Sequence, residues 1–220
     1  MTRVFVVDDQ ALVRAGLRMV LDSQPDMTVV GEAADGRQAL ESLAVTTADV
    51  VLMDVRMPRL DGVAATRALL ERDGAAGPRV IVLTTYDVDE YVFPALRAGA
   101  SGFLLKNARP EELLAAIRAV ASGDAIVAPT ATRRLLEQVA STLPDAPIDD
   151  SRLATLSDRE RAILLEVARG RSNAEIAAAL HIAESTVKTY LGRLRAKLDV
   201  HDRVQLVILA YDTGLVASRR

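Results

Sequence analysis

The first 124 residues alternate between short apolar runs and segments with helical periodicity. The five runs are rich in Val and Leu and occupy residues 4–7, 27–33, 49–55, 79–85 and 102–106. None of them alternates strictly between apolar and polar residues, which is typical of parallel strands covered on both faces. The pattern predicts an α/β domain in which five β-α units form a doubly wound, five-stranded parallel sheet.

Helix signals punctuate the rest of the chain and suggest where its domains end. Pro110 and the glutamates after it open a helix that stops near Gly123. Residues 129–141 predict one more helix, and residues 141–151, with two prolines and three aspartates, predict an exposed linker. The expected domains are therefore residues 1–124 and 152–220, with residues 125–151 as a helix and linker.

After the linker the periodicity is entirely helical. Capping-box patterns begin at Ser157 and Ser172, each with a glutamate three residues later and an apolar periodic run behind it. The predicted helices cover residues 158–169, 173–180, 184–198 and 203–212. This predicts a small all-α domain of four helices, whose second and third helices, joined by a tight turn, form a helix-turn-helix.

Composition and charge narrow the class of protein. The chain has no cysteine, so disulfides and thiolate metal sites are excluded. No apolar run reaches the ~18–20 residues of a membrane span, and the N-terminus reads as a strand rather than a signal peptide. We therefore expect a cytoplasmic protein with no membrane partner. The balance of charged residues is −7 over residues 1–150 and +4 over residues 151–220, which favours a polyanionic partner for the second domain.

Polar side chains gather where the predicted strands end. Asp8 and Asp9 follow the first strand, Asp54 and Thr84 end the third and fourth, and Lys106 ends the fifth. Because ligands of parallel α/β sheets bind at the carboxyl ends of the strands, these side chains should converge on one rim. A cluster of carboxylates there suits Mg²⁺, whose charge removes their mutual repulsion. The alternative is that Asp8 or Asp9 simply caps the following helix.

These residues, within VVDDQ, LMDVRMPRLDG, VLTT and GFLLK, give residues 1–124 a close resemblance to the flavodoxin-like receiver domain of bacterial two-component response regulators. The resemblance implies that Asp54 accepts a phosphoryl group from a sensor histidine kinase in the presence of Mg²⁺. It also implies that Asp9, Asp54 and the backbone carbonyl of Arg56 ligate the metal, while Asp8 acts through water. Lys106 would neutralise a phosphoryl oxygen.

The resemblance further implies a conformational switch. Thr84 would bond the phosphoryl group, and Phe103 occupies the place of an aromatic residue that turns inward as the hydroxyl moves; an ordinary core aromatic is the alternative. Arg56 and Tyr86, each two residues beyond a site residue, occupy places that tune hydrolysis, and their bulk predicts a phosphorylated state lasting minutes or longer. Asn107 departs from the Asp usual in this subtype, which we expect to alter only a loop contact.

The predicted helix over residues 184–198 has a polar face suited to the major groove of DNA. Val187, Leu191, Leu194 and Leu198 form one apolar stripe that should pack against the domain. Hydroxyls and cations, which reach base edges and phosphates, occupy the other face. These candidate DNA contacts are Ser185, Thr186, Lys188, Thr189, Arg193 and Arg195. For an isolated amphipathic helix, an ordinary solvated face would be the alternative.

The string from Leu156 to about Gly214 closely resembles the LuxR-type DNA-binding domain of NarL/FixJ-type regulators. The resemblance implies that Lys188, Thr189 and Gly192 face bases or backbone and that the last helix pairs subunits on DNA. Gly192 offers no side chain where some relatives carry a base-reading cation, and Tyr190 replaces a frequent His. Both departures leave the operator sequence open.

Together the two resemblances predict a two-component response regulator rather than an enzyme. Phosphorylation of Asp54 would control sequence-specific DNA binding and transcription, with Mg²⁺ as cofactor. The expected partners are a sensor histidine kinase, double-stranded DNA and a second copy of the chain when phosphorylated, with RNA polymerase a candidate. The alternatives are a regulator that binds DNA without phosphorylation and, less favoured, a Mg²⁺-dependent phosphoaspartate hydrolase. Such hydrolases show a DxD strand end and a cap domain, neither of which this sequence contains.

Overall fold

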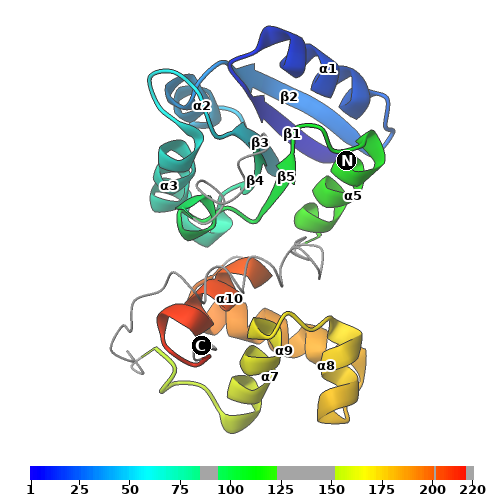
Figure 1. Ribbon diagram of the computed structural model, residues 1–220, viewed down its shortest axis with the longest axis vertical. Helices are drawn as coiled ribbons and strands as arrows, with labels where there is room; N and C mark the ends of the chain where they lie inside the picture. The colour runs from blue at the N-terminus through cyan, green and yellow to red at the C-terminus, as the bar shows by residue number, and fades with distance from the viewer. Residues whose placement is uncertain (85–93, 123–151, 201, 217–220) are drawn as a thin grey trace. The chain divides into compact units, whose positions relative to one another are not determined.

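The computed structural model describes residues 1–84, 94–122, 152–200 and 202–216 of the chain. The chain forms two compact units, Met1–Ile126 and Val127–Arg220, each considered by itself (Figure 1). The predicted helix over residues 129–141 and the linker after it lie outside the described residues. The precise domain limits at residues 124 and 152 therefore stay predictions.

The first unit contains the predicted five-stranded parallel sheet. Its strands are β1 (Thr2–Val7), β2 (Met27–Ala33), β3 (Val50–Asp54), β4 (Arg79–Thr84) and β5 (Gly102–Leu105). Their order across the sheet is β2-β1-β3-β4-β5, and every neighbouring pair is parallel. The predicted fold class is thus confirmed.

Helices cover both faces of this sheet. They are α1 (Ala11–Asp22), α2 (Gly36–Leu43), α3 (Gly62–Asp73) and α5 (Pro110–Ala121), with one 3₁₀ turn, η1 (Gly74–Ala76), after α3. Figure 1 shows α1 and α5 on one face and α2 and α3 on the other. No described helix combines the length and apolar composition needed to cross a membrane.

Alternating side chains of the strands fill two core layers. Val4 and Val6 pack with Leu52 and with Ile117 of α5 in one apolar cluster. Phe5, between them, is also buried and, because successive side chains of a strand point to opposite faces, belongs to the other layer. Burial on both faces explains why the strands read as unbroken apolar runs in the sequence.

The strand register brings the strand ends to one edge of the sheet. Val7 of β1 pairs with Met53 of β3, and Asp54 pairs with Leu83 of β4. From β1 the chain first adds β2 on one side, and it then adds β3, β4 and β5 in succession on the other side of β1. The strand order therefore reverses between β1 and β3. In open parallel sheets the binding crevice lies outside such a reversal, at the carboxyl ends of the strands. The fold therefore places a site after β1 and β3.

The described part of the second unit is helical, as predicted. It contains α7 (Asp158–Ala168), α8 (Asn173–Leu180), α9 (Glu184–Leu198) and α10 (Arg203–Asp212). Both predicted capping boxes are present, with the Ser side chain accepting from the backbone N–H of the Glu and the Glu side chain accepting from that of the Ser, at the starts of α7 and α8. These caps fix where the helices begin, since they satisfy N–H groups that would otherwise lack partners.

The core of this unit is one apolar cluster shared by all four helices. The predicted stripe of α9, namely Val187, Leu191, Leu194 and Leu198, is buried in it together with residues of α7, α8 and α10. Between α8 and α9, His181 adopts a left-handed conformation with φ of 52°, which ends α8 and turns the chain. The result is the tight helix-turn-helix that the spacing predicted.

Candidate phosphorylation site and DNA-facing helix

Asp8 and Asp9 directly follow β1, but the fold treats them differently. The Asp8 side chain is completely buried, whereas Asp9 is exposed. Asp8 Oδ1 accepts a hydrogen bond from the backbone N–H of Gln10 at 2.9 Å. Helix α1 has Gln10, not an aspartate, as its N-cap, and the Gln10 side chain makes no capping hydrogen bond. Capping of this helix is therefore not the reason for the paired aspartates.

Three carboxylates and one ammonium group converge at the end of β3. Within the described residues, Asp8, Asp9 and Asp54 each have an oxygen within 4.8 Å of an oxygen of the others. Lys106 Nζ, from the end of β5, lies 2.7 Å from Asp8 Oδ2 and 2.9 Å from Asp54 Oδ2. The structure thus brings together four of the five residues that the sequence predicted for the rim, and Lys106 bridges the two buried acids.

The charges in this cluster depend on one another. Burial raises the pKa of Asp54 above its ordinary value, Asp8 adds to the rise, and Lys106 opposes it. Burial alone would lower the pKa of Lys106, but its hydrogen bonds to Asp8 and Asp54 outweigh burial and raise it. The lysine therefore stays charged at neutral pH, and it offsets part of the repulsion between the two acids.

Thr84 and Phe103 occupy neighbouring strands near this cluster. Thr84 is the buried last residue of β4, and its backbone carbonyl accepts a hydrogen bond from the N–H of Lys106 at 2.8 Å. Phe103 lies in β5 opposite Val82 and is only partly buried. The inward turn of this ring therefore stays a prediction. Tyr86 lies outside the described residues.

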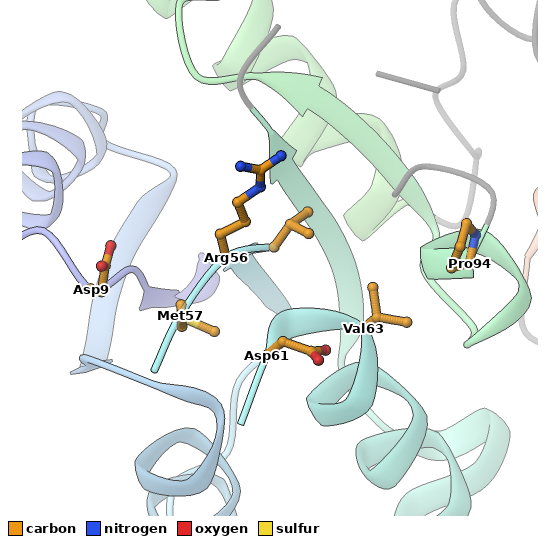
Figure 2. A pocket seen from close by; sticks show the side chains of 7 residues that line it. Asp9, Arg56, Met57, Asp61, Val63 and Pro94 are labelled. Atoms are coloured by element: carbon orange, nitrogen blue, oxygen red, sulfur yellow. The ribbon is translucent and has the colours of Figure 1, made fainter. Parts of the chain in front are cut away.

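A cavity of about 590 Å³ opens beside the acidic cluster (Figure 2). Asp9 lines one side, and Arg56 and Met57, from the loop after β3, line another. The remaining lining residues are Val55, Asp61, Val63 and Pro94. The cavity therefore lies next to the end of β3, and the exposed Arg56 is one of its lining residues.

Gly62, at the start of α3, allows the chain to fold closely over Asp54. Its N–H donates to the carbonyl of Val55 at 2.9 Å. A Cβ at this position would lie 2.0 Å from the backbone oxygen of Asp54, a distance that only glycine avoids. The apolar periodicity assigns Gly62 no role, although the Asp61-Gly62 pair where a helix begins is a visible signal in the sequence.

The residues present fit a hard divalent cation. Carboxylate oxygens are the ligands Mg²⁺ prefers, and Asp9 and Asp54 offer them at the open and the buried side of one cluster. Among the described residues, Lys106 is the one lysine that reaches the two buried carboxylates, so the three acids carry more negative charge than it balances. A bound cation would compensate the excess.

In the second unit, α9 presents a polar face away from its buried stripe. Ser185, Lys188, Thr189 and Arg193 are exposed, as predicted. Thr189 Oγ1 donates to the carbonyl of Ser185 at 3.0 Å, and Arg193 lies over the Tyr190 ring at 5.7 Å. The face therefore combines hydroxyls and cations on a helix held from behind by the core.

Three other predicted DNA contacts lie less openly on α9. Thr186, Gly192 and Arg195 are only partly exposed. With 3.6 residues per turn, Thr186 and Arg195 lie at the sides of the face, whereas Gly192 lies within it and a Cβ there would meet no atom within 4 Å. Lys188 Nζ lies 3.8 Å from Glu184 of the preceding turn, an exposed pair that water screens. The lysine is therefore available to a phosphate at little energetic expense.

Comparison with known proteins follows the same two units. Residues 4–118 match the response regulator receiver domain, and residues 154–210 match the luxR family of bacterial regulatory proteins. The chain is 40% identical over 214 residues to the uncharacterized transcriptional regulatory protein YxjL of Bacillus subtilis (strain 168), with 97% of each chain covered. It is 37% identical over 216 residues to the transcriptional regulatory protein LiaR of the same organism, covering 98% of this chain and 100% of LiaR.

A solved structure agrees with these relatives. The crystal structure of response regulator ChrA, from a heme-sensing two-component system, is 39% identical, covers 98% of each chain and superimposes with a TM-score of 0.51. A protein with a receiver fold, an acidic rim and a helix-turn-helix unit is a signalling regulator of transcription. The chain belongs to the bacterial response regulators that join a receiver domain to a LuxR-family DNA-binding domain.

Proposed function

We propose that Asp54 is the phosphoacceptor and that its phosphorylation by a sensor histidine kinase controls DNA binding through α9. The observation that carries the proposal is the bridge from Lys106 to Asp8 and Asp54, at 2.7 and 2.9 Å, beside the exposed Asp9. Phosphoryl transfer depends mainly on positioning and charge neutralisation, and this arrangement supplies both.

In the transfer, a carboxylate oxygen of Asp54 forms a bond to phosphorus while the bond from phosphorus to the donor's imidazole nitrogen breaks. The imidazole nitrogen takes up a proton as it leaves, and Asp54 becomes an acyl phosphate. Lys106 then bonds an oxygen of the transferred group, and the Thr84 hydroxyl bonds another. No separate substrate is turned over, so the chain is a receiver of the phosphoryl group rather than an enzyme.

Asp9, Asp54 and the backbone carbonyl of Arg56 would hold Mg²⁺, with Asp8 acting through water. The cation would supply charge neutralisation for the phosphoryl oxygens. Asp8, completely buried, fixes Lys106 from the other side, so the ammonium group already points at Asp54 before a donor arrives. Such preorganisation lowers the reorganisation needed in the transition state.

The phosphoryl group adds nearly two negative charges at the end of β3. We propose that Thr84 follows this charge and that Phe103 turns inward, so that the receiver changes state and the protein dimerises. Moving a two-state equilibrium from mostly off to mostly on requires a differential of roughly 5 kcal/mol, which assembly of two copies reaches more easily than one chain.

On DNA, the exposed face of α9 would enter the major groove, with Lys188 and Arg193 reaching phosphates or guanine edges and Thr189 reaching either. Two copies would read half-sites about one helical turn apart, roughly 10 bp. Such a complex would act in the cytoplasm, and RNA polymerase is the partner through which it would change transcription. The candidate second function, DNA binding without phosphorylation, shares this face but leaves the acidic cluster without a purpose.

The test is intact-protein mass spectrometry of the full chain after incubation with phosphoramidate and Mg²⁺, with wild type beside Asp54→Asn. One added phosphoryl group on wild type alone, followed by tighter binding to a duplex selected from a random-sequence pool, supports the proposal. An adduct on the variant as well would place the phosphoacceptor elsewhere. No adduct at any Mg²⁺ concentration, with the same DNA affinity in both proteins, would favour the phosphorylation-independent regulator.

A further inference from the structure

The loop after β3 is held at its two ends by different contacts. At its base, the N–H of Val55 donates to the carbonyl of Leu83 at 3.2 Å, and the N–H of Gly62 donates to the carbonyl of Val55 at 2.9 Å. At its far end, the loop contacts the start of α2 through Arg59 and Leu60. Between these ends lie Arg56 and Met57, which line the same cavity as Asp9.

The contact with α2 centres on Asp35, whose side chain is completely buried. Asp35 Oδ1 caps α2 by accepting hydrogen bonds from the N–H groups of Arg37 at 2.9 Å and Gln38 at 3.0 Å. Its second oxygen, Oδ2, pairs with the guanidinium of Arg59 from the loop. One oxygen of Asp35 therefore caps the helix, and the other forms the ion pair with the loop.

Two further features show that the loop is fitted to this place. Arg59 has a φ of 65°, a left-handed conformation that non-glycine residues adopt at some energetic expense. The next residue, Leu60, accepts a hydrogen bond through its carbonyl from the N–H of Gly36 at 3.0 Å. A Cβ at Gly36 would lie 2.7 Å from that carbonyl oxygen, so the backbones are in close contact.

We propose that the Asp35–Arg59 pair is a latch that positions the metal-binding loop, with Arg59 and Asp35 acting as positioning residues for Mg²⁺. The inference rests on the proposed function, because it assumes that the Arg56 carbonyl is a metal ligand. The latch lies three residues beyond Arg56 in the loop and fixes the far end of the segment that carries this carbonyl. Without it, the loop keeps the Gly36–Leu60 hydrogen bond but loses the ion pair beside it, so the Arg56 carbonyl would be less firmly positioned for the metal.

The two partners of the latch give a test that separates positioning from simple electrostatics. Arg59→Gln removes a positive charge near the site, which by charge alone would strengthen Mg²⁺ binding. Asp35→Asn removes a negative charge, which by charge alone would weaken it, while Asn still caps α2. A latch predicts the same outcome for both variants, namely weaker binding. The double variant should be no weaker than either single one, because the pair is broken only once.

The measurement is isothermal titration of MgCl₂ into the full-length wild type and each variant. We expect the Mg²⁺ dissociation constant to rise about tenfold in both single variants, the low end of the range for groups that orient a metal ligand. Phosphorylation by phosphoramidate should return to near the wild-type rate at saturating Mg²⁺, since Asp54 and Lys106 are untouched. Arg37→Gln, an exposed arginine on the first turn of α2, removes the same charge without touching the loop and should not weaken binding.

Opposite shifts in the two single variants would overturn the latch and leave only an electrostatic influence. Unchanged Mg²⁺ affinity in both would overturn it as well. If the wild type itself bound no Mg²⁺, or if Asp54→Asn bound Mg²⁺ and accepted phosphate as wild type does, the proposed function would fail, an outcome distinct from failure of the latch.

Discussion

Lys106→Met is the substitution that most directly probes the proposed phosphorylation site. Lys106 Nζ lies 2.7 Å from Asp8 and 2.9 Å from Asp54, and its own side chain is only 14% exposed. Methionine keeps most of the volume but removes the charge. Two carboxylates, one completely buried and the other 4% exposed, then face each other without a cation.

The expected loss of stability follows from the response of the folded protein that costs the least free energy. Removing one partner of a buried ion pair usually costs about 3–5 kcal/mol. The variant can instead hold one aspartate protonated, which at pH 7, against an ordinary pKa near 4, takes about 4 kcal/mol. We therefore expect a loss of about 3–4 kcal/mol in the free energy of unfolding of the receiver unit at pH 7 in metal-free buffer.

This response has a definite pH dependence. In the variant, a carboxyl group with a raised pKa binds a proton in the folded state that the unfolded state does not bind between about pH 4 and 7. The free energy of unfolding of the variant is therefore higher at low pH and falls as pH rises. The difference from wild type should grow by about 1.4 kcal/mol for each pH unit above 5.

Hydrogen exchange followed by mass spectrometry is the suitable assay, because it reports the amides of β1 and β3 separately from those of the second unit. Lys197→Met is the matched control. Its Nζ lies 2.9 Å from Glu160, but the side chain is 37% exposed, so the loss should be no more than about 1 kcal/mol. A loss below about 1 kcal/mol for Lys106→Met, unchanged between pH 5 and 8, would refute the view that Lys106 compensates two buried charges.

Three further substitutions test other parts of the chain. Gly62→Ala places a Cβ 2.0 Å from the Asp54 backbone oxygen, so we expect the free energy of unfolding, measured in urea, to fall by about 1–3 kcal/mol. Phosphorylation, followed by mass spectrometry, should also slow, and a wild-type rate would contradict this expectation. In Gly192→Ala the added Cβ meets no atom within 4 Å, so the substitution should stabilise its helix by about 1 kcal/mol. It should also weaken binding to a selected duplex, and unchanged affinity would show that DNA does not approach the backbone there. Arg3 lowers the pKa of Asp49 by hydrogen bonding, so that pair's contribution is complete above the unfolded pKa and lost as pH falls through the folded value. Asp49→Asn should therefore lower the free energy of unfolding by at most about 1 kcal/mol at pH 7 and by progressively less as pH falls through the folded pKa of Asp49. A loss that does not shrink with falling pH would disprove the assignment.

Much of the site was predictable because it depends on backbone periodicity alone. Parallel strands place their carboxyl ends at one edge, so the positions of Asp8, Asp54 and Lys106 at three strand ends were enough to predict that they meet. The spacing of apolar residues likewise predicted which face of α9 is buried, and all four residues of its stripe are in the core. The capping boxes marked two helix starts for the same local reason.

Other features required contacts between segments whose paths the periodicity does not describe. The sequence could not say that Asp8 is buried while Asp9 is exposed, because that depends on how the chain leaves β1. It gave no sign that Asp35 meets Arg59, 24 residues away, since the pairing depends on the shape of an irregular loop.

The sequence by itself determined the order of elements, the fold class, the candidate chemistry at the strand ends and which face of the candidate DNA-binding helix is polar. These follow from hydrophobic patterning, caps and strand direction, which are local or repeat along the chain. Only the tertiary structure decided that Lys106 bridges Asp8 and Asp54, that position 62 has no room for a Cβ and that the loop after β3 is bonded to α2. Such contacts depend on how side chains and backbone from segments far apart in the sequence pack closely together, and the hydrophobic periodicity of the sequence does not specify that packing.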